Sequence, residues 1–347
     1  MDGTWKQQNR ESSFELLRLL CIFGIVTMHT FGSFYASATG INLVYGVLLN
    51  SMFNMGVSLF MLISGYFGIR TSAKKIVHLE LAAIFYSVLH LLYVSYLQGA
   101  LSKKALIRAC FPVSDGTYWY ITCYMILLLF APFINQIPEK LKKKDFEKLL
   151  VLMLLVFCVL PSVIQLHVMG DNGKGVVNML LMYLIGRYLK LYGKENYGKA
   201  KMLLYGGVCV LAGFVLNYGL SLLINKGQGI YAPFARDCSV TIVFGSIFFF
   251  LLFREIKLQS KVINFLAKYV IGIYMFEGTF RGILRELIDI TVYGDKWYLF
   301  VVITIYVLVT MVACIIVDIL REQTIGRLDK PIAGLLNKVF QKVTGCS

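Results

Sequence analysis

The chain has 347 residues and a net charge of +15; 58% of its residues are hydrophobic and only 15% are charged. A soluble domain carries more charge and cannot bury this much apolar surface, so the composition excludes an ordinary soluble protein. Composition alone therefore predicts an integral membrane protein.

Ten apolar stretches are predicted to cross the membrane as α-helices, because each is close to the ~20 residues that one crossing needs. They are too long, and too continuous in their hydropathy, to be the alternating ten-residue strands of a membrane β-barrel. The predicted fold is therefore all-α, a polytopic transmembrane helical bundle. Its spans are residues 14–34, 41–66, 76–98, 118–136, 148–165, 175–191, 201–224, 237–253, 263–288 and 297–320.

Lysine and arginine residues are unevenly distributed between the two sides of this bundle. If the N-terminus is inside, the inner segments carry about three times as many of them as the outer segments, which is the positive-inside bias. This bias predicts that both termini are cytoplasmic. It also explains the basic charge by topology, so no nucleic-acid partner is expected.

Residues 14–320 are thus predicted to form one membrane domain, with a short cytoplasmic segment before it at residues 1–13. The tail, residues 321–347, has apolar side chains at helical spacing with lysines between them. This pattern is typical of a basic amphipathic helix lying on the inner leaflet. The apolar positions are Leu335, Leu336, Val339, Phe340 and Val343.

The eight cysteines contain no CxxC pair and no Cys/His cluster, so no metal site is predicted. A disulfide between Cys110 and Cys238 is conceivable but not expected. The turn Asp171–Gly175 is interpreted as a connecting loop and no more.

Two ionisable residues lie in the first predicted span, Arg18 and His29. Eleven residues of α-helix advance about 16 Å and make three turns plus about 20°, so both side chains point to the same face. Ionisable side chains at membrane depth usually face the bundle interior or a water-filled path and mark a functional site. Arg18 alone could instead extend to the inner headgroups, and His29 alone could be an interior histidine satisfied by a neighbour.

The ninth span carries Glu277, Arg281 and Arg285, which share one helix face at spacings of four residues. Counting 1.5 Å per residue places Glu277, Arg281 and His29 at about the same depth, in the outer half of the membrane. The alternative is that Glu277 and Arg281 merely neutralise each other and stabilise packing.

The histidine and the arginine of the first span suggest two steps of one reaction. An imidazole titrates near neutrality and suits a general base, and a guanidinium suits recognition of phosphate or carboxylate. Together they predict that an anionic donor is held from the inside by Arg18 and delivers its reactive end to His29. Acyl-coenzyme A has this form, with phosphates at one end and a thioester at the end of a long arm.

Four segments in this order resemble successive signatures of the acyltransferase-3 family, bacterial membrane enzymes that O-acylate surface polysaccharides and other glycans. The resemblance covers about residues 11–290. The segments are ELLRLLCIFGIVTMH (15–29), GVSLFMLISGYF (56–67), YWYITCYMILLLFAPFIN (118–135) and GIYMFEGTFR (272–281).

The resemblance implies that Arg18 and His29 are essential, and it carries the Ser-Gly pair of the family's second span onto Ser64 and Gly65. Trp119 matches the aromatic position that opens the family's fourth span. Glu277 is a departure, since many relatives have histidine there. Arg70 matches only part of an Arg-x-x-Arg pair.

Purely structural interpretations of these positions stay open. Ser64 and Gly65 could simply permit close helix packing. Trp119 and its neighbour Tyr120 could stack on a sugar acceptor or belong to an interfacial aromatic belt.

The sequence therefore predicts an O-acetyltransferase of the bacterial cytoplasmic membrane. It would transfer acetyl from acetyl-coenzyme A to a hydroxyl of a surface or capsular polysaccharide or its lipid-linked precursor, with no bound cofactor. The predicted partners are membrane lipids, acyl-coenzyme A and a glycan. The predicted roles are His29, Glu277 and Arg281 in catalysis, Arg18 and Arg70 in donor binding, and Trp119 and Tyr120 in acceptor binding.

Two alternatives come from other classes of protein. The first is a transporter or flippase of a glycan or small anion, although no inverted repeat supports it. The second is a non-catalytic relative that binds donor or glycan without turnover, which the departure at Glu277 suggests.

Overall fold

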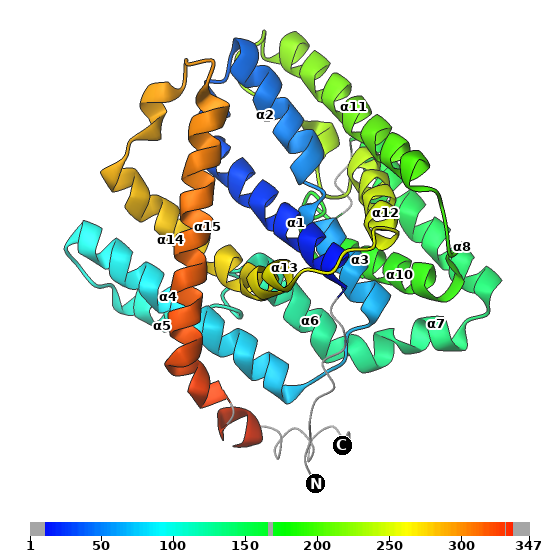
Figure 1. The fold of residues 1–347 in the computed structure, drawn as a ribbon, viewed down its shortest axis with the longest axis horizontal. Coiled ribbons are helices and arrows are strands. Elements are labelled where there is room, and N and C mark those ends of the chain that lie inside the picture. The colour runs from blue at the N-terminus through cyan, green and yellow to red at the C-terminus, as the bar shows by residue number, and fades with distance from the viewer. Residues whose placement is uncertain (1–10, 166–168, 330, 336–347) are drawn as a thin grey trace.

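The structure is a computed structural model, and it describes residues 11–165, 169–329 and 331–335. These residues form helices and connecting turns, with no β-strand among them (Figure 1). The long helices are α1 (Ser12–Phe31), α2 (Gly40–Phe53), α3 (Gly56–Phe67), α4 (Ala73–Gln98), α6 (Trp119–Ile134), α8 (Lys143–Leu154), α10 (Val176–Tyr192), α11 (Lys199–Ile224), α12 (Val240–Arg254), α14 (Val270–Leu287) and α15 (Leu299–Gln323).

Shorter helical segments connect or extend these helices. Four are α-helical: α5 (Lys103–Cys110), α7 (Gln136–Lys140), α9 (Leu160–Val163) and α13 (Lys261–Leu266). The others are tight or wide single turns: η1 (Gly32–Phe34), η2 (Leu155–Val159), η3 (Pro233–Ala235), η4 (Ala267–Tyr269), η5 (Ile290–Tyr293) and η6 (Ile325–Leu328).

The predicted fold class is confirmed, because eight helical segments of the described residues are long and apolar enough to cross a membrane. The two other predicted spans are helical but do not meet that standard. One is α10, which has only 17 residues. The other, 263–288, is divided into α13, η4 and α14, and α14 carries four charged residues. The count of ten spans and the cytoplasmic termini stay predictions.

The first helix lies at the centre of the bundle, where α1 contacts α2, α3, α12, α14 and α15 (Figure 1). Most of its side chains are buried, including both Phe14 and Phe31. By contrast α11, at the edge of the bundle, exposes large apolar side chains such as Leu204 and Leu211. In a membrane these side chains face lipid, so the exposed apolar surface is expected. The central position of α1 therefore keeps it away from the lipid-facing edge of the bundle.

The tail is described only in part. The apolar positions of the predicted amphipathic helix fall on residues 335–343, of which 336–343 lie outside the described residues. Residues 1–10 of the predicted N-terminal segment lie outside them as well. Neither prediction is tested by this structure.

Helices α3 and α10 pack at unusually short range because each presents a glycine to the other. A Cβ atom added at Gly65 would lie 2.1 Å from the carbonyl oxygen of Tyr183. One added at Gly186 would lie 2.4 Å from the carbonyl oxygen of Leu62. Small residues at such crossings let backbones approach and gain packing energy in lipid. Gly65 therefore has a packing role in this structure.

We expect the substitution Gly65→Ala to separate α3 from α10 and to destabilise the protein by about 1–3 kcal/mol, as overpacked cores are. The measurement is the thermal unfolding midpoint of the detergent-purified protein. Gly207→Ala in α11 is the control, because an added Cβ atom there meets nothing within 4 Å. Equal midpoints for the two variants would contradict the packing role.

Candidate active site

Two cavities meet inside the bundle, and His29 lies where they join. The smaller, which we call the narrower cavity, has a volume of about 320 Å³, and the larger, which we call the wider cavity, has a volume of about 850 Å³. The residues that line both cavities come from α1, the α2–α3 bend and two loops: Met28, His29, Asn54, Lys174 and Asp237. A side chain at this junction can meet a molecule that enters by either cavity.

The narrower cavity combines aromatic walls with two cationic side chains of its own, in addition to Lys174 at the junction. Arg18 and Lys268 both line it, and Ser64 contributes a hydroxyl. An apolar passage of this kind accepts a thin, flexible chain, and the cations suit an anionic group attached to it. The aromatic side chains of the wall are Phe53, Phe60, Trp119, Tyr120, Tyr124 and Tyr274.

The wider cavity has a different chemistry, because amide, hydroxyl and charged groups dominate its lining. Side chains of this kind recognise polyhydroxylated molecules by hydrogen bonds. The polar residues that line only this cavity are Tyr35, Asn50, Gln165, Asn172, Tyr231, Arg236, Glu277 and Arg281.

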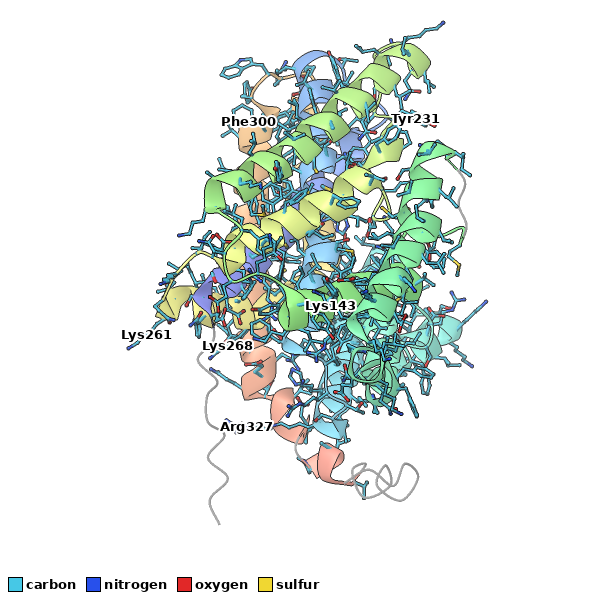
Figure 2. All side chains as sticks on the ribbon, turned by 90° about the vertical axis from the view of Figure 1, so that its right-hand side faces the viewer. Lys143, Tyr231, Lys261, Lys268, Phe300 and Arg327 are labelled. Atoms are coloured by element: carbon cyan, nitrogen blue, oxygen red, sulfur yellow. The ribbon has the colours of Figure 1, made fainter. Side chains whose placement is uncertain are left out.

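The two cavities extend toward opposite ends of the molecule. Figure 2 shows Lys268 of the narrower cavity near the end that carries Lys261 and Arg327. Tyr231 of the wider cavity lies near the other end, with Phe300. The charge bias of the sequence predicts that the end with Lys261 and Arg327 faces the cytoplasm.

A buried carboxylate connects the first helix to the ninth predicted span. Glu277 Oε1 lies 2.8 Å from His29 Nδ1, and its Oε2 accepts a hydrogen bond from Arg281 Nε at 2.5 Å. Arg281 Nη1 also donates to the backbone oxygen of His29, at 3.0 Å. The side chain of Glu277 is 7% exposed and that of His29 is 46% exposed. The carboxylate is thus enclosed, while the imidazole is open to the cavities.

These contacts show that the three residues meet, as the sequence argument predicted, while their depth in a membrane stays a prediction. The ion pair expected between Glu277 and Arg281 is also present, so the carboxylate of Glu277 contacts His29 and Arg281 at the same time. Because Nδ1 faces a carboxylate, the neutral imidazole carries its hydrogen on Nδ1 and leaves Nε2 free to accept a proton. Tyr306 supports the same helix by donating to the backbone oxygen of Arg281 at 2.8 Å.

Arg18 lies on the same side of α1 as His29, because both line the narrower cavity. Its Nη1 lies 3.1 Å from Oε1 of Glu15, one turn earlier in the helix. Glu15 is buried, and the sequence analysis did not identify it as a partner. The side chain of Arg18 is 31% exposed, so it retains hydrogen-bonding capacity toward the cavity.

Interruptions in two predicted helices bring polar groups into the cavities. The predicted span 41–66 bends at Asn54–Met55, between α2 and α3, and Asn54 lines both cavities. The short turn η4 separates α13 from α14 and places Lys268 in the narrower cavity. Irregular backbone at membrane depth is tolerated where it lines such a cavity.

The other predicted site residues divide between the cavities and the packing. Trp119 and Tyr120 line the narrower cavity with Arg18 and are absent from the lining of the wider one. Ser64 lines the narrower cavity and donates to the carbonyl oxygen of Phe60. Arg70 is exposed and lines neither cavity. The structure therefore does not bring Arg70 to Arg18.

Sequence reasoning missed many of the residues that line the cavities, among them the charged residues Lys174, Asp237 and Lys268. Lys174 was interpreted as part of a connecting loop, but this loop reaches the junction. The signal available in the sequence was weak, since each residue stands at the edge of a span where charged residues are common. No group of metal-binding side chains occurs in the part of the chain that the structure describes.

The helical membrane fold and the histidine bonded to a buried carboxylate between two cavities define a membrane protein equipped for proton-transfer chemistry. The acyltransferase domain of the acyltransferase-3 family matches residues 11–319, nearly the whole chain. The chain therefore belongs to this family and is a membrane acyltransferase. No curated protein and no solved structure matches it. Family membership favours the enzyme over the transporter alternative.

We expect Glu277→Gln to destabilise the protein by about 1–3 kcal/mol, because Arg281 loses a charged partner in a site that is mostly closed. In Arg281→Met it is Glu277 that loses its charged partner. The loss of unfolding free energy in the double variant should therefore be smaller than the sum of the losses in the two single variants. Thermal and denaturant unfolding measure these differences. Glu286→Gln, on the exposed end of α14, is the control. Additive effects would show that the pair is not coupled.

Proposed function

We propose that this membrane acyltransferase transfers an acetyl group from acetyl-coenzyme A to a hydroxyl of a surface or capsular polysaccharide, or of its lipid-linked precursor. The observation that carries the proposal is the position of His29. It is open to two chemically different cavities and is held by the buried carboxylate of Glu277. Such a base can act between a donor and an acceptor that approach from opposite sides of a bacterial cytoplasmic membrane.

The narrower cavity suits the donor. Its aromatic walls fit the thin pantetheine arm, and Arg18 and Lys268 suit the phosphates or the amide oxygens along the donor. The cavity extends toward the end predicted to be cytoplasmic, where acetyl-coenzyme A is made. In this proposal Trp119 and Tyr120 pack on the donor, in place of the acceptor contact predicted from the sequence. Arg70, being exposed, would act only on a donor group outside the cavity.

The reaction follows from the histidine–carboxylate geometry. Nε2 of His29 takes the proton from the acceptor hydroxyl as its oxygen attacks the thioester carbonyl carbon. The tetrahedral intermediate collapses with cleavage of the carbon–sulfur bond, and the imidazolium returns the proton to the thiolate. Glu277 fixes the imidazole and stabilises the imidazolium that forms. Arg281 positions Glu277, and in this proposal its positive charge is the candidate for offsetting the developing oxyanion.

The base assignment predicts that His29→Ala lowers acceptor-dependent turnover by about 10²–10⁴-fold, the usual contribution of a positioned general base. The assay follows free thiol released from acetyl-coenzyme A by protein in nanodiscs, with and without surface glycan extracted from the producing cells. His90→Ala is the control, because His90 is exposed and hydrogen-bonded to Thr279 away from both cavities. Full activity in a folded His29→Ala protein would exclude this base.

Donor binding by Arg18 predicts a second, separable effect. Arg18→Met should raise the KM for acetyl-coenzyme A by about tenfold or more, as expected for the loss of a charge-assisted hydrogen bond. The KM for the glycan should stay within twofold. Arg285→Met, an exposed arginine that lines neither cavity, is the matched control. An unchanged donor KM, or a change in the glycan KM instead, would contradict the assignment.

A further inference from the structure

We infer that Asp237 binds the acceptor, accepting a hydrogen bond from the hydroxyl adjacent to the one that reacts. The inference rests on the proposed function and names the acceptor class: a sugar unit or polyol with neighbouring hydroxyls. Asp237 is 2% exposed, and it lines both cavities beside His29. The position is therefore within reach of a molecule that delivers a hydroxyl to His29.

The carboxylate of Asp237 accepts a hydrogen bond from its own backbone N–H and keeps further acceptor capacity. Among the described residues no other side chain donates to it, and no cation lies within 4 Å of it. Burial of a carboxylate with few donors is costly, so buried carboxylates are nearly always paired with a cation or hydrogen-bonded by several groups. Other buried carboxylates in this chain follow the rule, such as Glu277 with Arg281 and Asp318 with Arg321. A donor from a bound acceptor would complete the site at Asp237.

The loop that carries Asp237 is also held in place by groups other than this carboxylate. Arg236 connects this loop to α9 and the residues that follow it, because its side chain donates hydrogen bonds to the backbone oxygen of Pro161 and to the side chain of Gln165. The amide of Asn178 reaches the backbone oxygen of Asp237, at 3.4 Å, and leaves its side chain uninvolved. A purely structural role is therefore filled by other groups.

A second loop supplies the positive charge near Asp237. Asp171 Oδ1 accepts a hydrogen bond from the backbone of Gly173, whose φ is +83°, in a tight turn. A Cβ atom at Gly173 would lie 2.5 Å from the backbone nitrogen of Cys238, so only glycine allows this turn to pack against the Asp237 loop. The next residue, Lys174, is exposed at the junction and interacts electrostatically with Asp237.

The two loops thus form one acceptor-binding element. Lys174 lines the junction beside Asp237, and among the described residues it forms no ion pair with the carboxylate, so the carboxylate oxygens stay available to hydroxyl donors. Because His29 and Asp237 both line the junction, a sugar that gives the proton of one hydroxyl to His29 can place a neighbouring hydroxyl against Asp237 in this proposal. A site built to bind a substrate hydroxyl discriminates strongly against molecules that lack it. Asp237 would therefore select acceptors with adjacent hydroxyls.

The experiment compares wild type, Asp237→Ala, Asp237→Asn and Lys174→Met in nanodiscs, with acetyl-coenzyme A and the extracted surface glycan. We expect Asp237→Ala to lower kcat/KM for the glycan by about 10–100-fold, the loss of a hydrogen bond to a charged group. Asp237→Asn keeps an acceptor oxygen, so its kcat/KM for the glycan should fall less. Lys174→Met should raise the glycan KM. The KM for acetyl-coenzyme A should change less than twofold in all three variants.

The adjacent-hydroxyl requirement has its own readout, which is inhibition of glycan-dependent thiol release by small alcohols. We expect cis-1,2-cyclohexanediol to inhibit the wild type more strongly than cyclohexanol, and this difference to disappear in Asp237→Ala. Equal effects of the two alcohols on the wild type would overturn the requirement. Asp295→Asn and Lys296→Met, an exposed ion pair that lines neither cavity, are the matched controls and should behave as wild type.

The outcomes separate this inference from the proposed function. If the wild type releases no thiol in response to glycan, both fail. If the wild type is active and the glycan KM is unchanged in folded Asp237→Ala, only the acceptor-binding role of Asp237 is overturned. If the acetyl-coenzyme A KM rises instead, Asp237 belongs to the donor site. Unfolding midpoints of each variant identify a general loss of structure.

Discussion

The buried carboxylate of Glu277 is the interaction on which the site depends. It bonds to His29 of α1 on one side and to Arg281 of its own helix on the other, so it joins two helices that are nearly 250 residues apart in the chain. A carboxylate in this position costs free energy unless both oxygens are satisfied, and both are. The same two contacts fix the tautomer and orientation of the imidazole. Stability of the helix contact and readiness for proton transfer therefore have one physical cause.

Around this contact the bundle departs from regular membrane helices, and each departure lines a cavity. The bend at Asn54, the turn η4 before α14 and the two loops that carry Lys174 and Asp237 bring polar groups to membrane depth. Regular helices with apolar surfaces, such as α11, lie at the edge instead. The irregular segments thus lie inside the protein, where water or substrate can hydrogen-bond to their backbone N–H and C=O groups. The regular helices lie outside, because their backbone groups bond within the helix and need no partner from lipid.

Much of the fold and part of the site could be predicted from sequence. Hydropathy identified the long helices, because a membrane crossing needs a long apolar run, but it did not identify where two of the predicted spans are interrupted. The helical period placed Arg18 and His29 on one face, and depth counting placed Glu277 level with His29. The sequence could not predict that Trp119 and Tyr120 line the same cavity as Arg18, or that Arg70 lines neither cavity. It also could not predict that Gly65 packs against α10. Those facts depend on which helices are neighbours, and hydropathy carries no such information.

The sequence by itself determined the class of protein, the helical segments and the two ionisable residues of the first span, since each follows from local physical rules of length, period and cost of burial. Only the tertiary structure decided that two cavities meet at His29, that their linings differ, and that Lys174 and Asp237 come together there. The last pair comes from loops more than 60 residues apart, docked through Gly173. Loop docking depends on close contacts between backbones, and no periodic pattern of side chains records such contacts in advance.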